Sequence, residues 1–101
     1  MLSKNSIEHI KRVAKKHGAA RVILFGSCLR LPEAQAGDID LAVEGLAPET
    51  FMDMWNDLTW SEELGMKNVD LVRAEDCMPV MVMARAEGVI IFERDRAAVP
   101  A

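Results

Sequence analysis

The chain has 101 residues, half of them hydrophobic and 28% charged, and a formal net charge of -4. This length suits a single domain spanning residues 1–101, and the negative charge argues against direct binding to nucleic acid, which needs Lys and Arg to neutralise phosphates. No apolar stretch approaches the ~20 residues of a membrane helix, and the N-terminus lacks the apolar core of a signal peptide. We therefore expect a cytoplasmic protein, with Cys28 and Cys77 as free thiols.

Helical and strand periodicities alternate along the chain. In chain order, they predict a helix over residues 3–17, a strand over 21–25, a turn of helix over 27–31, a strand over 38–43, a helix over 48–64, a strand over 67–72, a helix over 77–87 and a strand over 89–92. The tail from Glu93 is expected to fray. Helices interleaved with strands indicate an α/β or α+β domain with one sheet covered by helices, whose strand order the pattern leaves open.

Several further side chains carry simple expectations. His9 and His17 lie beside lysines on the first helix and are predicted to be at the surface. Trp55 and Trp60 are five residues apart, so they cannot share one helix face, and we expect one in the core and the other exposed. The methionines of the last helix are predicted to pack in the core, although Met-rich faces also form adaptable interfaces; these are Met78, Met81 and Met83.

Three aspartates occupy strand positions that call for an explanation. Asp38 and Asp40 are two residues apart, so on a strand they project from the same face and repel each other when ionised. A hard divalent cation such as Mg²⁺ removes that repulsion and takes carboxylate oxygens as ligands. Asp70 lies in another apolar strand, and if the two strands are neighbours, three carboxylates converge to hold metal and accept a proton. The alternatives are turn residues at 38 and 40 and a surface aspartate at a strand end.

The strand over residues 21–25 ends at Gly26-Ser27, and a glycine and a serine at the end of a strand are typical of a phosphate-binding turn. A strand that turns at glycine into a short helix presents backbone N–H groups and a hydroxyl to a phosphate. Glycine permits the close approach that a side chain would block. Arg30 lies one helical turn further on, where it either reaches the same phosphates or stays solvated.

Gly26-Ser27, followed after ten residues by Asp38-Ile39-Asp40, resembles the GS-x10-DxD signature of polymerase-β-like nucleotidyltransferases. The run from Leu24 to Arg30 is similar to that of the small members, the minimal nucleotidyltransferases (MNT). Leu31 stands where those members have glycine. Asp70, between Val69 and Leu71, matches the third carboxylate of the family, and the likeness extends from about residue 22 to residue 92.

The resemblance implies a mixed β-sheet of about four strands covered by helices, and a Mg²⁺-dependent transfer of a nucleoside monophosphate, AMP from ATP, to a hydroxyl. It implies that Asp38, Asp40 and Asp70 are the catalytic and metal-binding residues, and that Gly26, Ser27 and Arg30 bind the nucleotide. Many small members are antitoxins paired with a helical HEPN-type toxin, and some transfer AMP to a tyrosine of that toxin. The resemblance thus suggests a protein adenylyltransferase acting on a HEPN-type partner.

Two other functions stay open at this point. One is a non-catalytic binding module that neutralises a partner toxin. The other is a transferase acting on a small molecule such as an aminoglycoside, although a chain of 101 residues lacks the extra domain that usually forms such a pocket. Self-association as a homo-oligomer also remains open.

Overall fold

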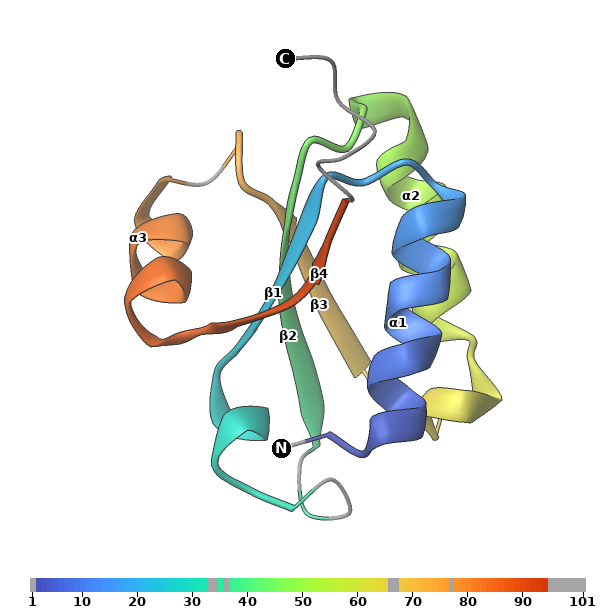
Figure 1. The fold of residues 1–101 in the computed structure, drawn as a ribbon, viewed down its shortest axis with the longest axis vertical. Coiled ribbons are helices and arrows are strands. Elements are labelled where there is room, and N and C mark those ends of the chain that lie inside the picture. The colour runs from blue at the N-terminus through green and yellow to red at the C-terminus, as the bar shows by residue number, and fades with distance from the viewer. Residues whose placement is uncertain (1, 33–34, 36, 66–67, 77, 95–101) are drawn as a thin grey trace.

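The computed structural model describes residues 2–32, 35, 37–65, 68–76 and 78–94, and within them four strands form one mixed sheet with helices on both faces (Figure 1). The elements in chain order are α1 (Lys4–Lys16), β1 (Arg21–Phe25), the 3-10 helix η1 (Ser27–Leu29), β2 (Asp38–Glu44), α2 (Pro48–Thr59), the 3-10 helix η3 (Glu62–Leu64), β3 (Asn68–Arg73), α3 (Met78–Glu87) and β4 (Val89–Glu93). The predicted fold class is confirmed, and each predicted element has a counterpart.

The strand order, which the sequence pattern left open, is β3-β2-β1-β4. Strand β1 runs antiparallel to both β2 and β4, whereas β2 and β3 are parallel. A parallel pair needs a crossover connection, and α2 provides it between β2 and β3. The parallel register brings the aspartates of two distant sequence segments to the same level of the sheet.

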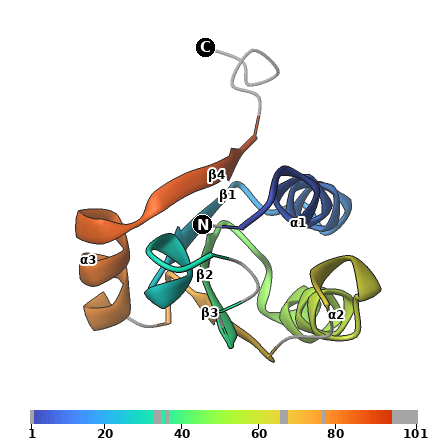
Figure 2. The same ribbon diagram turned by 90° about the horizontal axis from the view of Figure 1, so that it is seen from below.

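Helices α1 and α2 cover one face of the sheet and α3 covers the other (Figure 2). The larger hydrophobic core lies under α1 and α2, and the smaller lies on the α3 side. Along β2, Ile39 and Leu41 belong to the larger core and Ala42 to the smaller one. Because side chains alternate along a strand, Asp38 and Asp40 project on the α3 side.

Helix α1 begins and ends as its sequence predicts. The Ser3 hydroxyl accepts a hydrogen bond from the Ser6 backbone N–H at 3.2 Å and so caps the helix. Residues Ile10, Val13 and Ala14 are buried against the sheet. Gly18, with φ +79°, takes the left-handed conformation that ends the helix.

The prediction of one continuous helix over residues 48–64 was wrong. Helix α2 ends at Thr59, Ser61 is extended, and η3 forms a separate turn. The break turns Leu64 into the core, where it is 1% exposed. It also brings the Ser61 hydroxyl to 2.8 Å from Nε2 of His9 on α1. Tertiary contacts between α1 and the end of α2 therefore override the helical periodicity.

The prediction that both histidines lie at the surface was also wrong. His9 is half-buried in its contact with Ser61, and the His17 side chain is only 11% exposed. His17 donates a hydrogen bond from Nε2 to Oδ2 of Asp57 on α2 at 2.6 Å. His9 and His17 thus connect α1 to Ser61 and to Asp57 of α2. These partners are distant in the chain, so the residues that surround each histidine in the sequence do not predict the contacts.

The predicted start of the fraying tail needs correction as well. Glu93 belongs to β4, and its Oε2 lies 2.7 Å from the Arg21 guanidinium, so the sheet holds it. The rest of the predicted tail, from residue 95, lies outside the described residues. No helix in the described part of the chain is both long and apolar enough to cross a membrane.

The remaining expectations are met where the structure describes the residues. Trp55 is half-buried and Trp60 is 68% exposed, as expected for two tryptophans on different faces. Cys28 is a free, buried thiol, whereas Cys77 lies outside the described residues. The side chains of the predicted core methionines also lie outside them; these are Met78, Met81 and Met83.

Asp57 links the two helices of the larger layer and should make stability depend on pH. Its hydrogen bond with His17, and next that with Lys16 at 3.3 Å, lower the pKa of Asp57. A lowered carboxyl pKa adds stability above the unfolded-state pKa, and this stability is lost as the pH falls through the folded pKa. We expect Asp57→Asn to destabilise the protein by about 0.5–1 kcal/mol at pH 7, since solvent screens the pair.

Urea denaturation as a function of pH measures this effect. The difference between Asp57→Asn and the wild type should shrink as the pH drops below the normal aspartate range. Asp53→Asn, an exposed change on the same helix, is the control and should differ little from the wild type at any pH. A difference that is independent of pH would contradict a role for the Asp57 charge.

Candidate functional site

The turn after β1 requires glycine for two separate reasons. Gly26 has φ +83°, a conformation that side chains make costly, and its carbonyl accepts the N–H of Leu29 at 3.2 Å to start η1. A Cβ atom built on Gly26 would also overlap the carboxylate of Asp40. The turn therefore lies directly against β2, and only a residue without a side chain allows the Asp40 carboxylate to occupy its position.

The parallel pairing of β2 and β3 brings the sequence-predicted aspartates together. Asp40 is the register partner of Asp70, and Asp38 is the partner of Asn68. Asp38 and Asp70 are exposed, whereas Asp40 is half-buried between the Gly26 turn and β3. The three carboxylates therefore come from two neighbouring strands at the end of the sheet where β2 and β3 begin.

Asp40 has the most perturbed environment of the three. Burial raises its pKa first, and the negative charges of Asp70 and then Asp38 raise it further. The negative charges of Asp38 and Asp70 therefore repel that of Asp40, as the sequence predicts for aspartates that share a site. A cation bound at the three carboxylates would relieve it.

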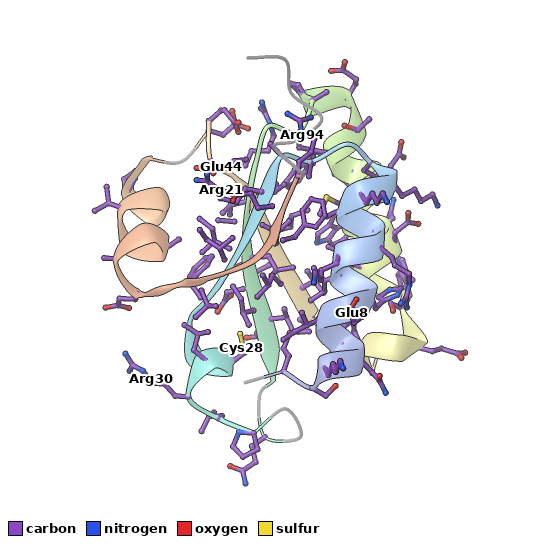
Figure 3. All side chains as sticks on the ribbon, viewed as in Figure 1. Glu8, Arg21, Cys28, Arg30, Glu44 and Arg94 are labelled. Carbon is purple, nitrogen blue, oxygen red and sulfur yellow. The ribbon has the colours of Figure 1, made fainter. Side chains whose placement is uncertain are left out.

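Cys28 lies under the same turn but is not positioned as a nucleophile. Its thiol donates a hydrogen bond to the carbonyl of Phe25 at 3.2 Å and is fully buried. Burial is the main cause that raises the pKa of the Cys28 thiol, which disfavours the reactive thiolate. Figure 3 shows Cys28 directed toward the interior from η1. Its role is packing beneath the loop.

Of the predicted nucleotide-binding residues, Arg30 is not held against the carboxylates. Arg30 is exposed, and Figure 3 shows its side chain directed away from the sheet. Ser27 begins η1, but its side chain is outside what the structure describes. Gly26 is therefore the one predicted nucleotide-binding residue whose contact with the aspartates is seen.

The carboxylate oxygens at this end of the sheet are ligands that Mg²⁺ binds, although the described residues do not form a complete metal-binding group. Within the described residues, no three His, Cys, Asp or Glu side chains are grouped closely enough to hold a metal ion. The donors at this end of the sheet are nevertheless carboxylate oxygens, the ligands that Mg²⁺ takes alongside water and phosphate. The overlap of a Gly26 Cβ with Asp40 also indicates that backbone and carboxylate share a confined space.

A pocket of about 410 Å³ opens beside Asp38 and Asp70, at the edge of the sheet formed by β3. The residues that line it are Asp38, Trp55, Thr59, Asn68, Val69 and Asp70. The Trp55 indole is fixed by a hydrogen bond from Nε1 to the carbonyl of Val69 at 2.9 Å. Sequence reasoning missed Thr59 and Asn68, since no motif includes them, and expected only that one of Trp55 and Trp60 would lie in the core and the other would be exposed.

Comparisons with known proteins agree with this geometry. Residues 8–97 match the family model described as "Polymerase beta, Nucleotidyltransferase". Among solved structures, the fold is similar to a chain in the complex of a tri-AMPylated Shewanella oneidensis HEPN toxin with an MNT antitoxin, with a TM-score of 0.66 and 19% identity. That alignment covers 91% of this chain and 73% of the other. No curated protein matches the sequence. Because the family model spans most of its length, the chain belongs to the polymerase beta nucleotidyltransferase family.

Proposed function

We propose that this chain is a Mg²⁺-dependent nucleotidyltransferase that transfers AMP from ATP to a hydroxyl of a partner protein, and that the partner is a HEPN-type toxin. The observation that carries the proposal is the position of Asp40, directly opposite Asp70 on β3 and in close contact with the Gly26 turn. Carboxylates beside a glycine turn are what a triphosphate and its metal require.

Each residue has a proposed role in this reaction. Gly26 and Ser27 bind the β and γ phosphates through the backbone N–H groups and hydroxyl of the turn. Asp38 and Asp40 would hold the magnesium, which when bound neutralises the charge of the phosphates. Asp70 completes the site and accepts the proton of the attacking hydroxyl. Arg30 assists after its exposed side chain turns toward the phosphates.

The proposed partner rests on the comparison and on how the described residues are used. The similar solved structure contains an MNT antitoxin together with a HEPN toxin that carries AMP groups. The sheet and its covering helices take up most of the described residues, which favours an acceptor hydroxyl that comes from outside this domain.

One observation favours a second function, a non-catalytic module that covers a partner. The three aspartates do not form a closed metal-binding group within the described residues. Exposed carboxylates reorient readily, however, and Asp38 and Asp70 are both exposed. The catalytic function is therefore the better supported of the two.

The test is to co-express the chain with the protein encoded beside it, purify the pair and measure the intact mass of that neighbour. We expect the mass to increase by one or more AMP units when Mg²⁺ and ATP are present and not when EDTA removes the metal. Asp38→Asn should abolish the increase, whereas Asp53→Asn, an exposed aspartate on α2, should leave it intact. Co-purification with no added mass would favour the binding module, and a neighbour that neither binds nor gains mass would exclude both functions.

A further inference from the structure

A second pocket, the α1–α2 groove, lies between the two helices that cover the larger core. Its volume is about 290 Å³, and the residues that line it are His9, Arg12, Val13, Lys16 and Asp57. Figure 2 shows α1 and α2 side by side on one face of the sheet, whereas Asp38 and Asp40 project on the face covered by α3. No residue of the α1–α2 groove belongs to the proposed transfer site, so the groove needs a separate explanation.

Two contacts fix the walls of the α1–α2 groove. Nε2 of His9 lies 2.8 Å from the Ser61 hydroxyl, and Nε2 of His17 lies 2.6 Å from Oδ2 of Asp57. The two histidines are about two helical turns apart, so α1 is joined to the end of α2 at two levels. The groove is therefore already formed in the free chain, and a preformed surface loses little conformational entropy when it binds a partner.

The charge of α1 is opposite to that of the rest of the chain. Five of the 12 Lys and Arg residues lie in the 13 residues of α1, together with one of the 16 Asp and Glu residues, Glu8. Five positive charges and one negative charge give α1 a formal charge of +4, so the other residues of this chain of net charge -4 together carry -8. A positive surface on an otherwise acidic chain attracts a negatively charged partner.

Arg12 is the groove residue whose charge is available to such a partner. It is exposed and forms no ion pair with any residue that the structure describes. Lys16, in contrast, lies 3.3 Å from Asp57, and His17 contacts the same carboxylate, so the charge of Asp57 is already compensated. A carboxylate that enters the groove therefore meets the guanidinium of Arg12, whose N–H groups can bind both of its oxygens.

Trp60 adds an aromatic surface at the rim of the α1–α2 groove. Its side chain is 68% exposed. It follows Asp57 by three residues, so the two are neighbours on the surface of α2, and it precedes Ser61, which contacts His9. One exposed tryptophan is not by itself a site, but tryptophan and arginine are the residues that dominate the energetics of protein–protein interfaces. Trp60 and Arg12 beside a preformed groove are therefore typical of a protein-binding surface.

Other classes of partner fit the α1–α2 groove less well. Helix α1 cannot insert into a membrane, because its apolar residues Ile10, Val13 and Ala14 are buried against the sheet. A nucleic acid would approach a chain of net charge -4 and would bring its phosphates close to Asp57. An acidic protein segment needs one cation and an apolar surface, and the groove supplies both.

We propose that the α1–α2 groove binds an acidic amphipathic helix of a partner protein. Its carboxylates bind Arg12, and its apolar side chains pack against Val13 and Trp60, in the way that an amphipathic helix lays its apolar face into a groove. The inference does not depend on the proposed transferase, because the groove lies on the other face of the sheet from Asp38 and Asp40.

The probes are two fluorescent amphipathic helical peptides with leucines at the same positions, whose polar positions carry glutamate in one and lysine in the other. Binding to the full chain is measured by anisotropy without Mg²⁺ or ATP, so the result is independent of any AMP transfer. We expect the glutamate peptide to bind at least about tenfold more tightly than the lysine peptide. About 1 M salt should remove most of this preference, because it shortens the screening length to ~3 Å.

Arg12→Glu should weaken binding of the glutamate peptide at least about tenfold, whereas Arg12→Lys, which keeps the positive charge, should retain most of the affinity. Lys15→Glu is the matched control, because it makes the same charge change on α1 at an exposed residue that does not line the groove. It should keep the affinity within about threefold of the wild type. Melting temperatures close to that of the wild type would show that the variants are folded.

Trp60→Ala should also weaken binding about tenfold, but it should leave the salt dependence unchanged, because the contact that it removes is apolar. Met52→Ala is its control, since Met52 is 55% exposed on the same helix and does not line the groove. Equal losses in Trp60→Ala and Met52→Ala would contradict the position of Trp60 in the docking surface.

The remaining outcomes decide between occupants of the groove. Equal affinity for the two peptides, or equal losses in Arg12→Glu and Lys15→Glu, would overturn the docking surface. A fluorescent single-stranded oligonucleotide that binds more tightly than the glutamate peptide, and that Arg12→Glu releases, would overturn the protein partner in favour of nucleic acid. Sedimentation of the chain alone tests the second copy: a dimer that Arg12→Glu dissociates would overturn the proposal, and a monomer supports it.

Discussion

Replacing Asp40 by asparagine is expected to lower the rate of AMP transfer at least about 100-fold while the fold persists. The Asp40 carboxylate lies opposite Asp70 and against the Gly26 turn, so it is central to the proposed metal and phosphate site. Asparagine has a similar shape but lacks the charge that would hold Mg²⁺. Transfer to the co-purified partner, followed by intact mass over time, measures the loss.

The same variant should be more stable than the wild type at neutral pH. Burial and the charges of Asp70 and Asp38 raise the pKa of Asp40, so its ionised form is disfavoured in the folded chain. A raised carboxyl pKa means that stability is highest below the unfolded-state pKa and falls as the pH rises through the folded pKa. The stability advantage of Asp40→Asn should therefore be present at pH 7 and vanish in acid.

Asp53→Asn serves as the control for both measurements, because Asp53 is an exposed aspartate on α2 that does not line the pocket beside Asp38 and Asp70. It should retain transfer and show no such pH-dependent stability difference. If Asp40→Asn kept transfer within about threefold of the wild-type rate, the carboxylate would have no role in the transition state.

Gly26→Ala should abolish nucleotide binding and destabilise the fold. The left-handed backbone alone costs an alanine about 1–2 kcal/mol. The new Cβ would also overlap the Asp40 carboxylate, and such overpacking costs a further ~1–3 kcal/mol. Displacement of Asp40 should remove the rise in melting temperature with Mg-ATP, which at ~100 times Kd corresponds to about 2.7 kcal/mol.

Gly18→Ala measures the cost of the left-handed backbone without the overlap with the Asp40 carboxylate. Gly18 has nearly the same backbone conformation, with φ +79°, but no atom lies within 4 Å of a Cβ built there. It should lose only the backbone part of the stability and keep the shift with Mg-ATP. In the Gly26→Ala background, Asp40→Ala should recover part of the lost stability, since it removes the overlapping carboxylate. Equal losses in the two glycine variants, with the Mg-ATP shift intact, would contradict the close approach at Gly26.

Local sequence signals were enough to predict the order and type of the elements, although not where the helix from residue 48 ends, and to place the aspartates on strands. Period-two alternation put Asp38 and Asp40 on one strand face, and the structure has both on the α3 side of β2. Gly26 was predicted to allow the close approach of a phosphate, which stays a prediction; the approach that the structure shows is that of the Asp40 carboxylate. The placement of the aspartates follows from the sequence because strand alternation depends on residues that are adjacent in the chain.

The sequence by itself therefore determined the order and type of the elements and the residues that carry charge at strand positions. Only the tertiary structure decided that β2 and β3 are parallel neighbours, which brings Asp70 opposite Asp40 although thirty residues separate them. It also decided that α2 ends at Thr59, and so formed the pocket with Trp55 and Asn68. Strand pairing and helix packing depend on contacts between distant segments, and the free energy of those contacts is absent from any local pattern.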